Sequence, residues 1–261
     1  MATLRGPGGC PWDREQTFES LSQFVLEEAY EVVDAIERRD AGALCEEIGD
    51  HIFEGVFLAQ IASELGRFTV ADTLTAASDK LIRRHPHVFK EDGRLHDEGS
   101  KERAPSAAAA LSRWDSQKAQ EKSTAGSTSS VLGELPGSLP ALLRAYKLGK
   151  RAAGAGFDWA NAADVVDKIE EEVAELREAL GRTDGGDGTR EERAEEEMGD
   201  LLFAIANLSR KLGIEPEAAL RKANQKFARR FRAMETRIAT SGRTMSAMSL
   251  DEMEAEWQKV K

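Results

Sequence analysis

The spacing of apolar and polar positions along the chain predicts an all-α protein. Apolar residues recur every three or four positions over long stretches, as on one face of a helix. No stretch alternates with the period of two, flanked by Asn-Gly or Asp-Gly turns, that would indicate a strand hairpin. We expect helices over residues 18–38, 43–65, 70–84, 106–120, 139–151, 162–180, 190–212 and 216–240, followed by a last helix that begins at the capping-box pair Ser249 and Glu252.

The chain consists of two similar halves. Acidic and basic motifs of the first half return in the same order in the second: Leu26–Glu31 with Glu170–Glu175, Glu46–Asp50 with Glu196–Asp200, and Asp79–Arg84 with Gln225–Arg230. A run of small polar residues at 123–130 is the candidate linker. We therefore predict a helical domain at 1–122, a linker at 123–137 and a second helical domain at 138–261.

Composition and charge exclude several classes of protein. The chain has 261 residues, with 36 basic and 47 acidic side chains and a net charge of −11, so a protein that coats nucleic acid is not expected. It has no apolar run of transmembrane length, and Met1–Asp13 lack the apolar core of a signal peptide. Two cysteines are too few for a disulfide framework. We expect a cytoplasmic protein without membrane or nucleic-acid partners.

Paired carboxylates are the candidate chemistry. Residues three positions apart share a helix face, so each half carries two acidic pairs that flank apolar stripes. The pairs are Glu28 with Glu31, Glu47 with Asp50, Glu172 with Glu175, and Glu197 with Asp200. We expect them to converge at the margin of packed helix pairs, where a hard divalent cation, Mg²⁺ or Mn²⁺, would relieve their repulsion. The competing interpretation is that they are ordinary solvated helix faces.

Basic residues follow the second acidic motif in each half. Lys226 and Arg230 share one helix face with Asn224 nearby, and Lys80 and Arg84 mirror them. Such cations next to a metal would neutralise phosphate oxygens, as polyphosphate hydrolysis requires. The sequence has no GxxxxGK[ST] segment and lacks the paired ExxH motifs of a di-iron bundle.

These motifs resemble the MazG family of all-α nucleoside triphosphate pyrophosphohydrolases. EExxE followed by ExxD on consecutive helices is its signature, and the match extends over nearly the whole chain. The segments that carry it are Cys10–Asp13, Asp79–Phe89, Gly156–Trp159, Glu195–Phe203 and Lys222–Phe231. The resemblance implies magnesium-dependent hydrolysis of NTPs and dNTPs to the monophosphate and pyrophosphate, with the main activity in the C-terminal domain. It also implies a homodimer whose subunits share helices around the sites.

The resemblance also implies roles for individual residues. Glu172, Glu175, Glu197 and Asp200 would be metal ligands, and Glu28, Glu31, Glu47 and Asp50 keep the same pattern for a second site. Lys226 and Arg230 would hold phosphates, Trp257 and Lys261 would meet the nucleotide, and Lys118 and Arg193 would be further nucleotide-contacting cations, with Arg193 replacing a lysine. As a mechanistic hypothesis of our own, we expect Glu171 or Glu172 to orient or deprotonate the attacking water.

The two acidic sites are not spaced identically. The gap from Glu172 to Glu197 is 25 residues, whereas that from Glu28 to Glu47 is 19, because a glycine-rich loop at 184–188 lengthens it. Stacking on Trp257 would give broad base specificity, suited to cleansing of the nucleotide pool or a stress response. The alternatives are a non-catalytic helical nucleotide-binding or adaptor module and a narrower phosphohydrolase acting on dUTP, dCTP or phosphoribosyl-ATP.

Overall fold

The computed structural model describes residues 1–97, 104, 106–124, 130–181 and 189–261, and these residues are helical apart from turns and one isolated bridge between Phe89 and Leu95. The chain separates into two compact units, unit 1 (Met1–Ser127) and unit 2 (Thr128–Lys261). Part of the expected linker, residues 125–129, and the expected glycine-rich loop lie outside the described residues. The finer domain boundaries at 122 and 138 stay a prediction.

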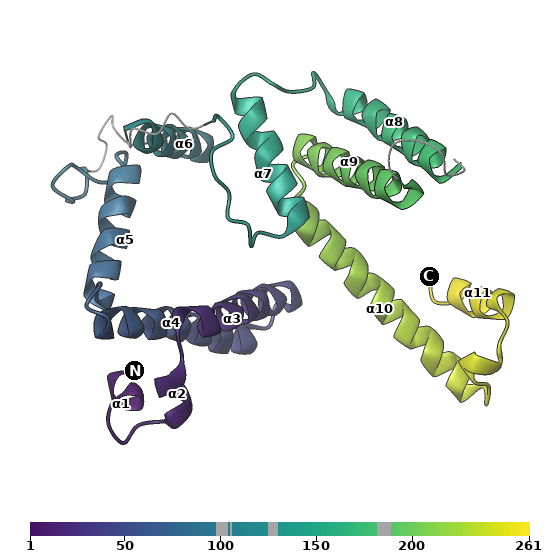
Figure 1. The fold of residues 1–261 in the computed structure, drawn as a ribbon, viewed down its shortest axis with the longest axis horizontal. Coiled ribbons are helices and arrows are strands. Elements are labelled where there is room, and N and C mark those ends of the chain that lie inside the picture. Colours follow the sequence, from purple (N-terminus) through teal and green to yellow (C-terminus); the bar gives the residue numbers. More distant parts are fainter. Residues whose placement is uncertain (98–103, 105, 125–129, 182–188) are drawn as a thin grey trace. The chain divides into compact units, whose positions relative to one another are not determined.

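Unit 1 is built around a hairpin of two long helices (Figure 1). Leu21, Phe57 and Ile61 form its buried core, with Phe18 and Phe24 packed against them. The helices are α1 Ala2–Arg5, α2 Pro11–Glu15, α3 Phe18–Arg38, α4 Ala41–Glu64, α5 Val70–Arg84 and α6 Ala107–Thr124. The hairpin α3–α4 carries both acidic pairs of the first half.

Unit 2 repeats the hairpin and adds a helix on its other side (Figure 1). Helix α9 lies between α7 and α8, and α7 approaches closely because Gly149 faces the fully buried Asn207: a Cβ at position 149 would lie 2.1 Å from the Asn207 Oδ1. The elements are α7 Ala141–Gly154, α8 Ala162–Gly181, α9 Arg190–Lys211, α10 Pro216–Thr240, the 3₁₀ turn η1 Met245–Ala247 and α11 Leu250–Gln258.

Side-chain caps fix where the long helices begin. Thr17, Thr69 and Thr189 each close a capping box with the third residue of the helix that follows. Ser249 and Glu252 form the capping box expected at α11. The expected helices are therefore confirmed, with ends that differ by a few residues at most. Three short elements, α1, α2 and η1, were not predicted, because they are too short for a helical period to show.

The apolar stripes that flank the acidic pairs were expected to pack in the hairpins, on α9 through Met198, Leu201, Ile205 and Leu208, and this expectation is wrong for two of these four residues. On α9 the buried positions include Ala204, Ala206 and Asn207, whereas Met198 and Ile205 are exposed. The small residues let the neighbouring helices approach closely, which turns the larger side chains outward. Among the described residues, no helix is long and apolar enough to cross a membrane.

Candidate active site

The hairpin α8–α9 brings three of the expected carboxylates of unit 2 together. Glu172 of α8 and Glu197 and Asp200 of α9 each offer an oxygen within 4.8 Å of the other two. Opposite ligands of an octahedral Mg²⁺ stand about 4.2 Å apart, twice its usual bond length, so this spacing fits one cation. Glu175 is not in this group, although its charge acts on Glu197. Glu172 is buried rather than at the margin of the pair, which corrects our expectation.

The hairpin α3–α4 forms a corresponding cluster in unit 1. Glu28, Glu31 and Glu47 have carboxylate oxygens within 4.8 Å of one another. Asp50 is outside this group, but its charge contributes to the raised pKa of Glu28. Glu54, one helical turn after Asp50, adds a further carboxylate that the sequence analysis did not single out. The acidic motif that is repeated in the sequence therefore forms a cluster of three carboxylates in each unit.

Burial and mutual repulsion make both clusters unfavourable for negative charge. In unit 1, burial followed by the charges of neighbouring carboxylates raises the pKa of Glu28 and that of Glu47. In unit 2, burial and then the charges of Glu175 and Glu172 raise the pKa of Glu197. The buried oxygens Glu28 Oε2 and Glu172 Oε2 have no hydrogen-bond partner. Unpaired buried carboxylate oxygens are what a divalent cation would satisfy, so the residues fit such an ion.

A lysine at the unit 2 cluster was missed by the sequence analysis. The Lys168 Nζ lies 2.8 Å from Glu171 Oε1 and 2.8 Å from Glu172 Oε1. These two hydrogen bonds, Glu171 before Glu172, raise the pKa of Lys168. Glu171 itself is exposed and lies outside the three-carboxylate group, so Glu172 is the better placed of the two expected catalytic carboxylates.

The expected phosphate-binding residues lie on α10. Asn224 and Lys226 are exposed, and Arg230 is half-buried with its Nη2 donating to the Lys261 carbonyl oxygen at 3.0 Å. Helix α10 extends away from the α8–α9 hairpin (Figure 1). Within this unit the structure therefore gathers the carboxylates in one place and these cations in another.

The C-terminal residues gather around the same part of α10. The Trp257 ring lies 5.4 Å from that of Phe227, which in turn lies 5.8 Å from that of Phe231. These rings line a cavity of about 350 Å³ together with methionines of α10, η1 and α11. Lys261 thus contacts Arg230, and Trp257 packs on Phe227 of the same helix; their contact with a nucleotide stays a prediction.

The other expected contacts are less directly placed. Lys118 belongs to α6 of unit 1, and its side chain lies outside the described residues. Arg193 lies in the first turn of α9, half-buried and engaged with a partner. In unit 1, Lys80 is exposed and the Arg84 guanidinium lies over the Trp114 ring, 5.4 Å from its centroid. Their roles stay predictions.

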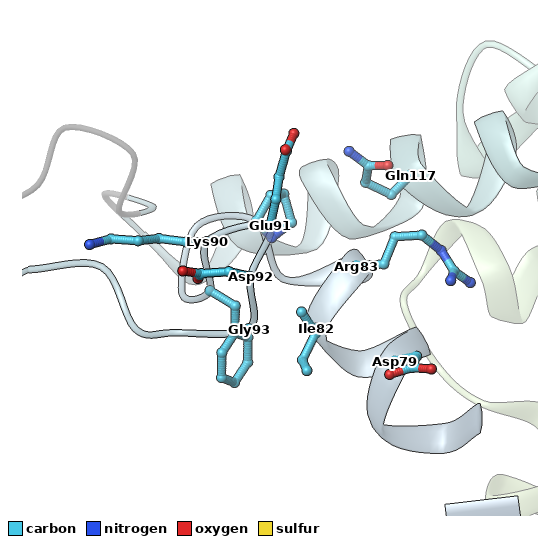
Figure 2. Close-up of a pocket in the computed structure, with 10 residues that line it drawn as sticks. Asp79, Ile82, Arg83, Lys90, Glu91, Asp92, Gly93 and Gln117 are labelled. Atoms are coloured by element: carbon cyan, nitrogen blue, oxygen red, sulfur yellow. The ribbon is translucent and has the colours of Figure 1, made fainter. Parts of the chain in front are cut away.

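A separate cavity of about 580 Å³ lies in unit 1, outside the acidic cluster. Figure 2 shows Asp79, Ile82 and Arg83 of α5 beside the loop Lys90–Gly93, with Gln117 of α6 across from them. Both acidic and basic side chains line it, and none of the clustered carboxylates does. This mixture of charges favours neither a metal nor a phosphate.

Comparison with known proteins identifies the family of the chain. The model of the MazG nucleotide pyrophosphohydrolase domain matches the chain twice, at residues 16–89 and 161–234. A protein of Escherichia coli (strain K12) named nucleoside triphosphate pyrophosphohydrolase is 46% identical over 100% of this chain and 94% of its own length. One of Thermotoga maritima, named nucleoside triphosphate pyrophosphohydrolase/pyrophosphatase MazG, is 42% identical over 100% and 92%.

A relative of Bacillus subtilis (strain 168), the uncharacterized protein YabN, is 40% identical over 99% of this chain and 49% of its own length. The two matched segments contain the two hairpins and both acidic clusters. The fold and the repeated site therefore define an all-helical nucleotide pyrophosphohydrolase. The chain belongs to the MazG family and carries its domain twice in tandem, so the resemblance seen in the motifs is confirmed.

Proposed function

We propose that the chain hydrolyses nucleoside triphosphates and deoxynucleoside triphosphates, with broad base specificity, to the monophosphate and pyrophosphate in a reaction that depends on Mg²⁺. The observation that supports this most is the three-carboxylate group of unit 2, with a buried Glu172 oxygen that has no partner. Glu172, Glu197 and Asp200 would hold the cation, and Glu175, whose charge acts on Glu197, would complete the acidic surroundings. Mn²⁺ is a chemically suitable substitute.

The residues of the chain divide the work of the reaction. A bound magnesium ion supplies Lewis-acid stabilisation of the phosphate oxygens and a more acidic water. Lys168 fixes the Glu172 carboxylate through Oε1, so that the unpartnered Oε2 would hold the cation and Glu172 would orient the attacking water beside it. Lys226 and Arg230 neutralise the leaving pyrophosphate, and Trp257 offers an aromatic face to any base. Broad base specificity would suit a role in cleansing the nucleotide pool.

We further propose that the active assembly is a homodimer in which the partner subunit supplies the cations. Equivalent apolar residues are exposed on both hairpins: Ile48, Ile52 and Phe53 on α4, and Met198, Leu202 and Phe203 on α9. Repetition of an exposed apolar stripe at equivalent positions is typical of an interface. A second observation favours the dimer. Within unit 2 helix α10, with Lys226 and Arg230, extends away from the carboxylates, so the α10 of a partner subunit could supply the cations to this site.

Product analysis with NTPs and dNTPs tests the reaction. We expect monophosphate and pyrophosphate only when Mg²⁺ is present. Glu172→Gln should lower turnover by more than the ~10–100-fold that loss of an outer-shell partner costs. The exposed Glu170→Gln on the same helix is the matched control and should keep its activity. Diphosphate and orthophosphate as products would refute the proposed bond cleavage, and nucleotide binding without turnover would favour the binding-module alternative.

Subunit mixing tests the shared site. Glu172→Gln and Arg230→Ala chains are each expected to be nearly inactive, but a mixed dimer rebuilds one intact site from two chains. Random mixing should therefore recover about one quarter of wild-type turnover, since about half of the dimers are mixed and each has one good site. No recovery in dimers that carry two different affinity tags, and are therefore known to be mixed, would place the cations and carboxylates in one subunit.

A further inference from the structure

The ammonium group of Lys168 holds the carboxylate that a cation would need. Lys168 reaches Glu172 from the preceding turn of α8, at 2.8 Å, and binds Glu171 at the same distance. The Glu172 side chain is only 5% exposed, so its charge is compensated here by a neighbour rather than by water. Its second oxygen, Oε2, is buried with no partner. The unit 2 cluster thus contains a cation of its own.

The unit 1 cluster differs at the equivalent position. Aligning Glu27–Glu31 with Glu171–Glu175 places Phe24 where unit 2 has Lys168. Phe24 packs against the buried core of unit 1 and the Trp12 ring, 5.8 Å away. The described part of unit 1 therefore has an apolar side chain where unit 2 supplies a positive charge.

A second difference makes the contrast larger. Aligning Asp50 with Asp200 places Glu54 where unit 2 has the buried Ala204. Glu54 Oε2, like Glu28 Oε2, is buried without a hydrogen-bond partner. Unit 1 thus gains a carboxylate and lacks the lysine, which makes its cluster more negative by two charges than that of unit 2.

The charge difference acts directly on cation binding. Two like charges a few ångströms apart repel strongly where the surroundings are partly buried. A free metal ion that takes the unpartnered Glu172 Oε2 must bind beside the Lys168 ammonium, which is bonded to the other oxygen of the same carboxylate. In unit 1 the buried oxygens of Glu28 and Glu54 are unpartnered, and Phe24 stands at the position of the lysine. Unit 1 should bind free cations more readily.

We propose that Lys168 is a built-in counter-ion of the unit 2 cluster, so that free divalent cations bind the unit 1 cluster more tightly and enter unit 2 together with the nucleoside triphosphate. The triphosphate offers the Lys168 ammonium further negative partners, which offsets its repulsion of the cation. This inference rests on the proposed function of the unit 2 site. It gives the two copies of one motif different behaviour towards the same ion.

Titration of the full chain with Mn²⁺, without nucleotide and followed by electron paramagnetic resonance, tests the order of binding. We expect two classes of site that differ by at least about tenfold in affinity, as one added charge nearby would produce. The tighter class should disappear in Glu28→Gln and the weaker class in Glu172→Gln. If the tighter class disappears in Glu172→Gln instead, or if the two classes have equal affinities, the proposal is wrong. This test keeps the wild-type Lys168.

Substitution of the lysine is the second arm. In a background that carries Glu28→Gln and Glu47→Gln, Lys168→Met should bind Mn²⁺ at least about tenfold more tightly than the background does. The matched Lys168→Arg, which keeps the charge, should leave the affinity close to that of the background. Weaker or unchanged binding in Lys168→Met, in a chain whose circular dichroism is that of the folded protein, would refute the counter-ion role.

Failure of this inference and failure of the proposed function are distinguishable. A wild-type chain that hydrolyses NTPs with Mg²⁺ but binds Mn²⁺ equally in both units overturns only the role of Lys168. A chain that binds no Mn²⁺ and shows no turnover overturns the proposed function and the inference together.

Discussion

Asp158 offers the most quantitative test of how unit 2 is held together. It lies in the segment between α7 and α8, where its carboxylate accepts hydrogen bonds from the Arg210 guanidinium and, at 2.8 Å, from the Lys211 ammonium. Lys211 also donates to the Trp159 carbonyl oxygen. These contacts fix the segment that precedes α8 against the end of α9, and α8 carries Glu172.

The ion pairs stabilise the charged form of this side chain. The hydrogen bond from Arg210, followed by the weaker one from Lys211, lowers the pKa of Asp158 from 3.8 to about 2, against the opposing effect of burial. A difference of about 1.8 pKa units corresponds to at most about 2.4 kcal/mol of folding free energy. Asp158 as a whole residue is exposed, so solvent screening lowers this to about 1–1.5 kcal/mol.

The sign of the pH dependence follows from the direction of the shift. Because the folded pKa is below the unfolded one, the stabilisation is present above the unfolded value near 3.8 and disappears as the pH falls towards 2. Asp158→Asn should therefore lower the free energy of unfolding by about 1–1.5 kcal/mol at pH 7. The gap between variant and wild type should stay constant down to about pH 4 and close by about pH 2.

Urea denaturation at a series of pH values, followed by circular dichroism, measures this gap. Asp167→Asn, an exposed acidic residue on α8, is the control and should change stability by less than about 0.5 kcal/mol. An Asp158→Asn variant as stable as the wild type at pH 7 would contradict the ion-pair assignment. A gap that persisted unchanged at pH 2 would show that the stabilisation comes from packing rather than from charge.

Two further substitutions test packing and anchoring. Gly149→Ala should destabilise unit 2 by about 1–3 kcal/mol, because the new Cβ would lie 2.1 Å from the Asn207 Oδ1. Gly154→Ala, with nothing within 4 Å of its Cβ, is the control and should be near neutral. Thermal unfolding compares the two variants, and equal melting temperatures would count against the close approach of α7. Arg5→Ala should release the segment before α3, because Arg5 binds the Glu64 carboxylate at 2.8 Å and the Asp13 and Gln16 carbonyl oxygens. Limited proteolysis should then cut the variant before residue 17 while its helix content is retained. A cleavage pattern like that of the wild type would refute the anchoring role.

The sequence predicted the helices well, because local signals determine them. The capping pair Ser249 and Glu252 and the breaks at glycines and prolines placed helix ends within a few residues. The repeat predicted four carboxylates at each site, and three of the four meet in each hairpin, because helix spacing leaves two acidic pairs few arrangements. It did not predict that Glu172 is buried or that Met198 is exposed, because these depend on how closely α7 and α8 approach α9. Small residues such as Gly149 set that approach through tertiary packing.

The two halves of the chain also differ at positions next to their shared motifs. Phe24 corresponds to Lys168, and Glu54 corresponds to Ala204, and a search for shared motifs does not detect such differences. Those positions lie one helical turn from the carboxylates that the two halves share, so each changes the charge that a cation meets without touching the motif itself. A chain that carries one acidic site twice can thus separate tight binding of a free ion from binding of an ion with its nucleotide. A chain that carries both Lys168→Met and Ala204→Glu removes the two charge differences from unit 2. Its unit 2 should bind Mn²⁺ with an affinity closer to that of unit 1. An unchanged affinity in the folded variant would show that other differences between the hairpins decide it.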